Sequence, residues 1–283
     1  MNLLEDALAP SNVQAAWQHL RRDHAPWALD VPRKNLEKDL PLHLTALVDD
    51  LRTGRFRPQS LRQYSVRKGD GGTRIISAQF MRDKFAQRLI YQILEPRIDP
   101  YLHPDSFGYR RGRGVHQAIA RVRERINTGL NWLVDADIRS FFDRVPHSGI
   151  KKLLKRFVPD PRVLKLIDQW MILGAHRDSL LSARRGLPQG TIISPLLCNL
   201  YLHTLDEKLS QASIPFVRYA DDFLLLTPSQ VSAEQSQRFA GKVLERLGLE
   251  LHPDKTRVCR ASVNIKFLGE PVVHRRFWQR KAR

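Results

Sequence analysis

The segment RYADDFLLL, residues 218–226, places two adjacent carboxylates inside a run that otherwise has the composition of a buried strand. Two like charges at such a position are costly unless a positive group neutralises them. Short apolar segments lie on both sides of Asp221 and Asp222, and this pattern predicts a β-hairpin with the acidic pair at its turn. We therefore expect both carboxylates at one end of a sheet, within reach of bound ions.

A second acidic segment, VDADIRSFFD at residues 134–143, has the pattern of a strand in its first half. Side chains two apart in a strand point to the same face, so Asp135 and Asp137 are predicted to share one. If this strand neighbours the hairpin, three or four carboxylates converge. Hard oxygen ligands select Mg²⁺, and two such ions about 3.5–4 Å apart can activate a 3′-hydroxyl and stabilise a departing pyrophosphate. The alternative is a solvated, inert turn.

The charge balance points to a polyanionic partner. The chain has 283 residues, with 47 Lys and Arg against 29 Asp and Glu, a net charge of +18. Neutralising phosphates releases condensed counterions, so nucleic acid is the predicted partner, and the alternatives are a basic non-binding surface or an acidic membrane. The two cysteines lack metal-ligand spacing, and no signal peptide or apolar run of about 20 residues is found. We expect a cytoplasmic protein with no membrane partner.

The order of the predicted elements indicates the fold class. Strands are separated by helices without strict alternation, which is typical of an α+β fold. The pattern predicts helices broken by prolines over residues 1–60, a hairpin around residues 69–72, helices over 81–97 and 115–127, a strand over 131–138, a helix opened by Ser194 and Pro195, a helix over 233–247 and a short strand at 265–269.

Seven segments of the chain, taken in order, resemble the reverse transcriptases, especially the bacterial group II intron-like branch. They are VRKGDGGTRII with MRDK (66–84), SFGYRRGRGVHQAI (106–119), DADIRSFFD (135–143), LPQGTIISPLLCNLYLHTLD (187–206), RYADDFLLL (218–226), LELHPDKTRV (249–258) and KFLG (266–269). The resemblance implies an RNA-directed DNA polymerase that extends a primer with dNTPs on an RNA template.

The resemblance also implies roles for the acidic residues. Asp137 and Asp221 match the two principal metal ligands, and Asp222 matches a third acidic position that binds metal less directly. The cofactor implied is a pair of Mg²⁺ ions, for which Mn²⁺ can substitute. Asp135 falls outside the pattern and is interpreted as a residue behind the ligands or a solvated one. Lys255 matches a lysine that protonates pyrophosphate as a general acid; the alternative is a solvated surface lysine.

Further matches concern the nucleotide and the nucleic acid. Phe142 matches an aromatic gate that rejects a ribose 2′-hydroxyl, and the alternative is a core phenylalanine. The residues expected to bind the nucleotide are Lys68, Arg74, Phe142 and Gln189, and those expected to bind nucleic acid are Arg82, Arg110, Arg111, Arg113 and Gly190. On composition alone, Lys68 and Arg74, which flank the predicted hairpin turn at residues 69–72, would be ordinary solvated charges.

The resemblance implies a right-hand polymerase, with N-terminal helices and fingers in residues 1–130, a palm in 131–270 and a basic tail in 271–283. The tail contains Arg275, Arg276, Arg280, Lys281 and Arg283. Only 14 residues follow Gly269, too few for a thumb, so we expect the thumb to be missing or vestigial. A protein partner or fused domain is expected to replace it.

RSFFDRVPH and SAQFMRDK resemble reverse transcriptases of CRISPR adaptation, which suggests an integrase as the partner, a domesticated intron-like enzyme and a role in antiviral defence. Two rival functions stay open. One is a non-catalytic, maturase-like RNA-binding protein that keeps the fold, and the other is a palm polymerase that uses NTPs.

Overall fold

The chain consists of helices and strands that gather into two compact units. A computed structural model describes residues 2–67, 73–175 and 183–273. The first unit, called here the helical unit, contains Met1–Tyr101 and Val145–Leu197, and the second, the sheet unit, contains Leu102–Arg144 and Cys198–Arg283. Each unit is therefore assembled from two separate stretches of sequence. The mixture of helices and strands confirms the predicted α+β class.

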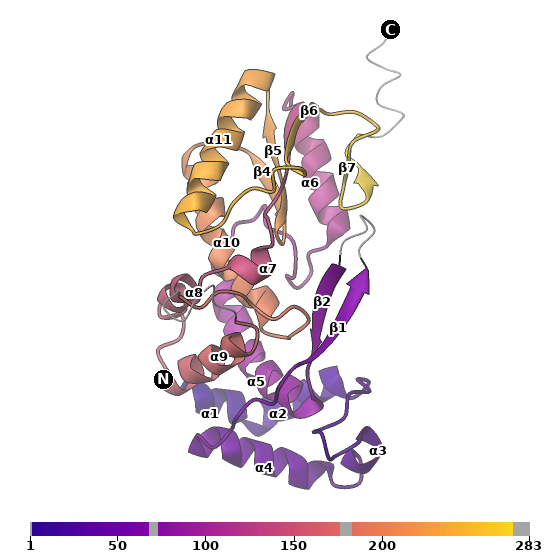
Figure 1. Cartoon of the computed structure of the whole chain (residues 1–283), viewed down its shortest axis with the longest axis vertical. Helices are drawn as coiled ribbons and strands as arrows, with labels where there is room; N and C mark the ends of the chain where they lie inside the picture. Colours follow the sequence, from indigo (N-terminus) through magenta and orange to yellow (C-terminus); the bar gives the residue numbers. More distant parts are fainter. Residues whose placement is uncertain (1, 68–72, 176–182, 274–283) are drawn as a thin grey trace. The chain divides into compact units, whose positions relative to one another are not determined.

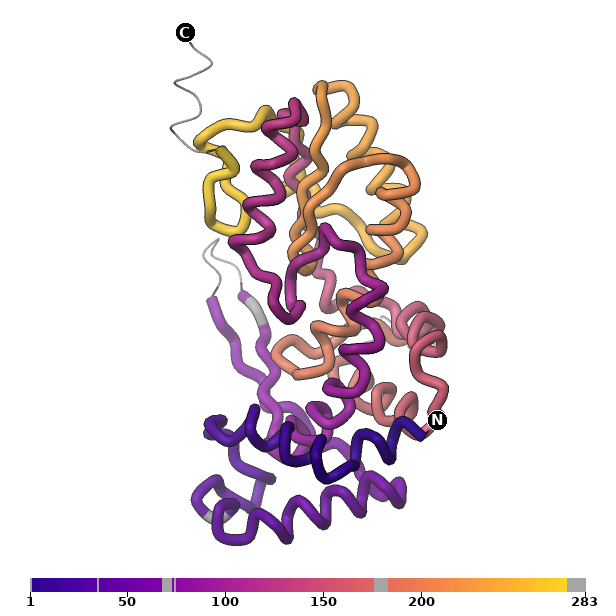
Figure 2. Tube along the Cα trace, turned by 180° about the vertical axis from the view of Figure 1, so that it is seen from behind, coloured from indigo at the N-terminus to yellow at the C-terminus, as the bar shows by residue number. Residues whose placement is uncertain are grey.

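The helical unit packs its helices around α5. Its helices are α1 (Leu3–Leu8), α2 (Pro10–Leu20), α3 (Arg33–Leu36), α4 (Leu40–Thr53), α5 (Met81–Ile98), the 3-10 helix η1 (Asp99–Tyr101), α8 (His147–Leu154) and α9 (Pro161–Leu173). In the view from behind, the indigo first helices lie against α5 (Figure 2). The apolar residues of α5 recur at helical spacing, and Phe85, Leu89 and Ile90 are fully buried. The apolar side chains of α5 are thus buried against the helices that it contacts, α1, α2 and α4.

A two-stranded hairpin projects from the same unit. Strand β1 (Arg62–Arg67) pairs antiparallel with β2 (Thr73–Ala78), and Gln63 lies opposite Ser77. The side chains of β1 are mostly exposed. The hairpin predicted around residues 69–72 is confirmed by this pairing.

The sheet unit contains a four-stranded antiparallel sheet in the order β4-β5-β3-β6. Its elements are α6 (Val115–Asn127), β3 (Trp132–Asp137), α7 (Phe141–Arg144), β4 (Phe216–Tyr219), β5 (Asp222–Thr227), α11 (Gln230–Arg246), β6 (Arg257–Arg260) and the short pair β7 (Lys266–Phe267) and β8 (Glu270–Pro271). Helix α10 (Ser194–Gln211) crosses the sequence boundary between the two units. Strand β3 is central and pairs with two strands that follow it much later in the sequence.

Two helices cover opposite faces of this sheet (Figure 1). Helix α11 packs on β3, β5 and β6, whereas α6 packs on β4 and β5. On the α6 face, Ala118, Ile119 and Val122 bury their side chains with Leu133 and Leu224 from the central strands. Spacings of three and four residues place the apolar side chains of α6 on a single stripe. The sheet is therefore buried on both faces, and its strand ends are left to carry polar groups.

The helices predicted over residues 81–97 and 115–127 correspond to α5 and α6, and the predicted strand over 131–138 corresponds to β3. Helix α10 begins at Ser194, and α11 begins three residues before the predicted start because Ser229 caps it. The division into fingers and palm near residue 130 stays a prediction. No helix among the described residues is long and apolar enough to cross a membrane.

Candidate active site

The acidic pair lies at a tight turn between two neighbouring strands. Tyr219 is the last residue of β4 and pairs with Asp222, the first residue of β5, so only Ala220 and Asp221 form the loop. Ala220 has a φ of 59°. This is the left-handed region, which an L residue adopts at a cost and which two-residue hairpin turns require. The hairpin predicted from RYADDFLLL is confirmed. Its turn consists of Ala220 and Asp221, so Asp222 is already the first residue of the next strand.

The strand that carries Asp137 lies directly beside this hairpin. Strand β3 pairs with β5, and Asp137 lies opposite Asp222 in the register. Residues opposite each other in an antiparallel pair share a face, with Cβ atoms about 4.5–5.5 Å apart. Asp221 occupies the adjoining turn. The structure therefore brings the three predicted carboxylates to the same end of the sheet.

The local electrostatics reflect this crowding of negative charge. Shielding from water, together with the charges of Asp221, Asp137 and Asp135, raises the pKa of Asp222 to about 7, and Lys255 opposes the shift. Asp222 as a whole residue is nevertheless exposed, so ions from solution can reach it. A nearby cation would stabilise the ionised form of Asp222, because it would offset the repulsion between the acidic side chains.

The carboxylates do not form a ready-made cage. Within residues 2–67, 73–175 and 183–273, no three His, Cys, Asp or Glu side chains form a group that could hold a metal ion as they stand. Mg²⁺ rarely needs such a cage, because one or two protein carboxylates usually hold it while water and substrate phosphates complete its shell. The opposed pair Asp137 and Asp222, with Asp221 beside it, is a donor set of this type.

Two basic side chains from the segment after α11 reach the same strand. The Lys255 Nζ atom lies 3.3 Å from the Asp137 Oδ2 atom, and both side chains are partly exposed. The segment is held there by the backbone, since the His252 amide donates to the Asp137 carbonyl over 2.8 Å. Arg257 pairs with Asp135 at 2.9 Å and lies opposite it on β6. Asp135 therefore has Arg257 as a partner, and its place outside the ligand set stays a prediction.

Phe142 lies on α7, a short helix that follows β3. Its side chain is 8% exposed, and its ring meets that of Phe141 edge to face with 5.4 Å between centroids. Phe141 is 1% exposed and so belongs to the core. Phe142 lies at the margin of that core, a position from which a ring edge can meet solvent or a ligand.

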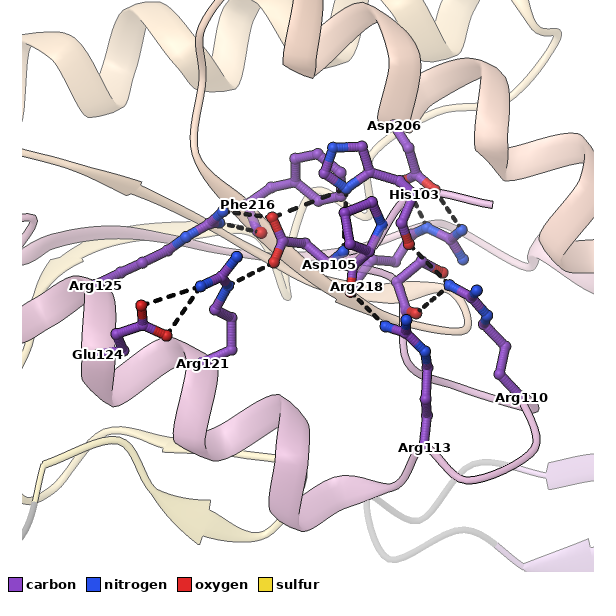
Figure 3. Close-up of polar contacts among 12 residues, drawn as sticks. His103, Asp105, Arg110, Arg113, Arg121, Glu124, Arg125, Asp206, Phe216 and Arg218 are labelled. Carbon is purple, nitrogen blue, oxygen red and sulfur yellow. Dashed lines mark hydrogen bonds and ion pairs between the residues drawn. The ribbon is translucent and has the colours of Figure 1, made fainter. Parts of the chain in front are cut away.

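A buried ion pair behind the hairpin was not predicted from the sequence. Arg218 on β4 and Asp206 on α10 are both fully buried, and the guanidinium binds the carboxylate through two hydrogen bonds of 2.7 and 2.6 Å (Figure 3). Burial is the largest single influence and lowers the pKa of Arg218, but the charge and hydrogen bonds of Asp206, together with the nearby Cys198 and Asp221, hold the pKa above its ordinary value. A signal existed: an Arg inside the apolar run PFVRYADDFLLL needs a buried carboxylate.

Two of the three predicted arginines of the glycine-rich loop turn inward. The Nη1 atom of Arg110 donates to the carbonyls of His103 and Ser106 at 2.8 and 2.9 Å, and Arg110 is 8% exposed. Arg113 donates to the Pro104 carbonyl (Figure 3). Both therefore fix the shape of the preceding loop, whereas Arg111 is exposed. A contact with nucleic acid stays a prediction for all three.

The Pro-Gln-Gly loop is anchored within the helical unit. The Ser77 amide of β2 donates to the Gln189 carbonyl over 2.7 Å, and the Gln87 Oε1 atom of α5 accepts from the Ile193 amide over 3.1 Å. Gly190 has a φ of 96°, and a Cβ there would lie 2.7 Å from the Ser77 carbonyl oxygen. Glycine is thus required at this point, and Gln189 is held next to it.

Arg82 and Arg74, also predicted as site residues, lie in the helical unit. Arg82 stacks over Phe56 at 4.5 Å and pairs with Asp50 at 3.3 Å, so its guanidinium ties α5 to α4. Arg74 lies on β2 opposite Val66. Lys68 and the five basic residues of the tail lie outside the described residues. Their roles stay predictions.

Comparison with known proteins is consistent with this geometry. The model of a family described as "Reverse transcriptase (RNA-dependent DNA polymerase)" matches residues 66–272. Protein YkfC of Escherichia coli is 29% identical over 89% of this chain and 77% of its own length. The group II intron-encoded protein LtrA of Lactococcus lactis is 30% identical over 61% of this chain and 29% of its own.

A solved structure shares the fold. A chain of the partial Cas6-RT-Cas1--Cas2 complex superimposes with a TM-score of 0.50 and 24% identity, over 87% of this chain and 42% of that chain. The chain therefore spans less than half the length of LtrA and of this solved chain, and more than two thirds of YkfC.

Proposed function

The chain belongs to the reverse transcriptase (RNA-dependent DNA polymerase) family, and from this premise we propose that it extends the 3′ end of a primer with dNTPs on an RNA template. The observation that carries the proposal is the placement of three carboxylates at one end of the sheet, with Asp137 opposite Asp222 and Asp221 in the turn. This end of the sheet has concentrated negative charge, exposure to solution and a lysine beside it.

Asp137, Asp221 and Asp222 are the residues that would hold two divalent ions, Mg²⁺ by preference, with Mn²⁺ as a substitute. Such ions activate the attacking hydroxyl and neutralise charge on the departing pyrophosphate. The protein's own contribution is to fix the carboxylates on rigid strands, since β3 and β5 are buried on both faces. Asp137 and Asp222 thus keep one separation, which suits a reaction that depends on positioning.

Lys255 is proposed as the general acid. Its Nζ atom is a proton donor 3.3 Å from Asp137, so it lies beside the proposed ligands. Pyrophosphate leaves with developing negative charge, and a proton from Lys255 would stabilise it. The Asp137 carboxylate holds the ammonium group near the strand end before substrate arrives.

The nucleotide and template contacts are proposed from the resemblance together with local structure. Phe142 would reject a ribose 2′-hydroxyl, and Gln189 with Gly190 would contact the nucleotide and template strand. Lys68 and Arg74 would bind the triphosphate, and the nucleic acid would be bound by Arg82, Arg110, Arg111 and Arg113. The rigid anchoring of the Gln189 loop supports its role, because a contact group must be held in place.

The biological setting is proposed from the resemblance and from a solved structure with the same fold. The right-hand assignment is fingers in residues 1–130 and palm in 131–270, in a domesticated intron-like enzyme of the cytoplasm. The likeness to a chain of a Cas6-RT-Cas1--Cas2 complex supports an integrase as partner and a role in antiviral defence, as expected from RSFFDRVPH and SAQFMRDK.

The test is primer extension on RNA and DNA templates with Mg²⁺, comparing dNTPs with NTPs. Asp137→Asn and Asp221→Asn are each expected to abolish extension while the melting temperature and template binding stay near those of the wild type. Asp135→Asn is the matched control: it lies on the same strand and face but pairs with Arg257, so extension should persist. Near wild-type extension by Asp137→Asn or Asp221→Asn would overturn the assignment. Binding without extension by the wild type would favour a non-catalytic RNA-binding protein.

A further inference from the structure

The Arg218 side chain attaches the acidic turn to the protein interior. Besides its pair with Asp206, the Arg218 guanidinium uses its Nη1 atom for two more hydrogen bonds. One runs to the Ala220 carbonyl over 2.8 Å, and the other to the Asn199 Oδ1 atom over 3.0 Å. Asn199 is 1% exposed, and Arg218 and Asp206 are fully buried. One guanidinium therefore binds two residues of α10, Asp206 and Asn199, and one residue of the turn, Ala220.

The hydrogen bond to Ala220 stabilises a residue whose backbone conformation is unfavourable. Ala220 has the left-handed conformation, which an L residue keeps only where its surroundings enforce it. The residue that follows is Asp221. A change in the backbone of Ala220 would rotate the next peptide unit and move the Asp221 carboxylate. The Arg218 guanidinium thus holds the residue directly before Asp221.

Stability alone does not account for a charge at this position. A buried ion pair loses hydration on folding, and apolar residues of similar volume are often as stable or more so. What an apolar pair cannot provide is a donor for the Ala220 carbonyl. The cost of burying Arg218 and Asp206 is therefore better explained by the geometry that they enforce.

The same cluster also holds the glycine-rich loop. The Asn199 Nδ2 atom donates to the Gly108 carbonyl over 2.7 Å. The Arg218 backbone completes the attachment, because its amide donates to the Asp105 carbonyl over 2.9 Å and its carbonyl accepts from the Phe107 amide over 2.8 Å. The loop that carries Arg110, Arg111 and Arg113 is thereby fixed to the strand that leads into the turn.

We propose that Arg218, held in place by Asp206 and Asn199, is a positioning residue that fixes the Ala220–Asp221 turn for nucleotide transfer. Arg218 is fully buried, and its side chain acts on the turn through the Ala220 carbonyl. The inference rests on the proposed polymerase function, and it names the residues on which the Asp221 geometry depends.

The test separates positioning from folding with a pair of variants. Arg218→Met leaves the Asp206 charge buried without its partner, so it should lower the melting temperature. Adding Asp206→Leu removes that charge, and the double variant should melt well above the single one. Because the Ala220 carbonyl still lacks its donor, kcat for single-nucleotide incorporation should stay at least about tenfold below the wild type. The Kd for primer–template, from fluorescence anisotropy, should not change.

Arg125→Met is the matched control. Arg125 is another partly buried arginine of the sheet unit that bonds a carboxylate, Asp105, and a backbone carbonyl, but the carbonyl is that of Phe216 at the opposite end of β4 (Figure 3). It should lower the melting temperature while kcat stays within about twofold of wild type. A parallel fall of kcat and melting temperature in both series would mean a purely structural role.

Asn199→Ala provides a second variant that leaves no buried charge unpaired. It should lower the melting temperature less than Arg218→Met does and still lower kcat, since the Arg218 Nη1 atom and the Gly108 carbonyl both lose a partner. The proposal is overturned if the double variant, or Asn199→Ala should the double variant not fold, incorporates nucleotide at the wild-type kcat. An inactive wild type would instead refute the polymerase function itself.

Discussion

Gly108→Ala is expected to impair catalysis by pushing on the acidic turn. A Cβ at residue 108 would lie 3.0 Å from the Tyr219 carbonyl carbon and closer still to the Ala220 amide nitrogen, whereas ordinary contact begins at 3.4 Å. Both obstacles are backbone atoms, so no side chain can swing away. The turn or the loop must move by about half an ångström or more, the margin within which a catalytic group has to be held.

The magnitude follows from that displacement. Misplacement by about 1 Å can cost a factor of about 100 in rate, so a fall in kcat of about 10- to 100-fold is expected. Crowding of a packed interior adds a loss of about 1–3 kcal/mol in the free energy of unfolding. The assay is single-nucleotide incorporation at saturating dNTP, with urea unfolding measured in parallel.

Gly114→Ala is the matched control in the same loop. Gly114 has an extended φ of −152°, and its added Cβ would meet only the flexible end of Gln117, at 3.4 Å. Wild-type kcat is therefore expected for this variant. The reasoning is refuted if Gly108→Ala also keeps the wild-type kcat, because the loop would then not bear on the turn.

Three further substitutions test the remaining parts of the site. Phe142→Ala should increase incorporation of NTPs relative to dNTPs, because a steric barrier is removed; Phe141→Ala, a core change, should destabilise the fold without altering that ratio, and equal ratios would return Phe142 to the core. Asp222→Asn should raise the melting temperature of the metal-free protein. Its folded-state pKa of about 7 lies above the ordinary value of 3.8, so ionisation between about pH 4 and 7 opposes folding, and the gain, measured with EDTA, should be larger at pH 8 than at pH 4. A gain that is independent of pH would contradict this account. Gly190→Ala should raise the KM for dNTP and lower kcat, since its Cβ would meet the Ser77 carbonyl at 2.7 Å; Gly54→Ala, which also has a positive φ but no atom within 4 Å, controls for backbone strain.

The sequence allowed local structure and the acidic residues to be predicted, because both depend on short-range patterns. Helical spacing located α5 and α6, and the alternation around residues 69–72 predicted the β1–β2 hairpin. The two acidic segments would bring their carboxylates together if their strands were neighbours, and the β3–β5 register shows that they are. Lys255 lies beside Asp137, and its role as a general acid stays a prediction.

What could not be predicted depends on contacts between distant segments. Arg110 was expected from the resemblance to bind nucleic acid, yet its guanidinium binds two backbone carbonyls whose positions only the folded loop defines. The Arg218–Asp206 pair joins a helix to a strand, and no spacing rule connects them. Each compact unit is likewise assembled from two separate stretches of sequence, and this depends on long-range packing that periodicity does not encode.

The pairing of β3 with β6 has a consequence for the protein during its synthesis. Asp135 and its partner Arg257 are separated by 122 residues, and Lys255 reaches Asp137 from the same late segment. At about 5–20 residues per second, a ribosome needs roughly 6–24 s to make that interval. Throughout this time the strand bearing Asp137 has been made but cannot be completed. A nascent chain therefore carries Asp137 long before Lys255 can reach it, and a chain whose translation stops before residue 255 lacks the lysine proposed as the general acid.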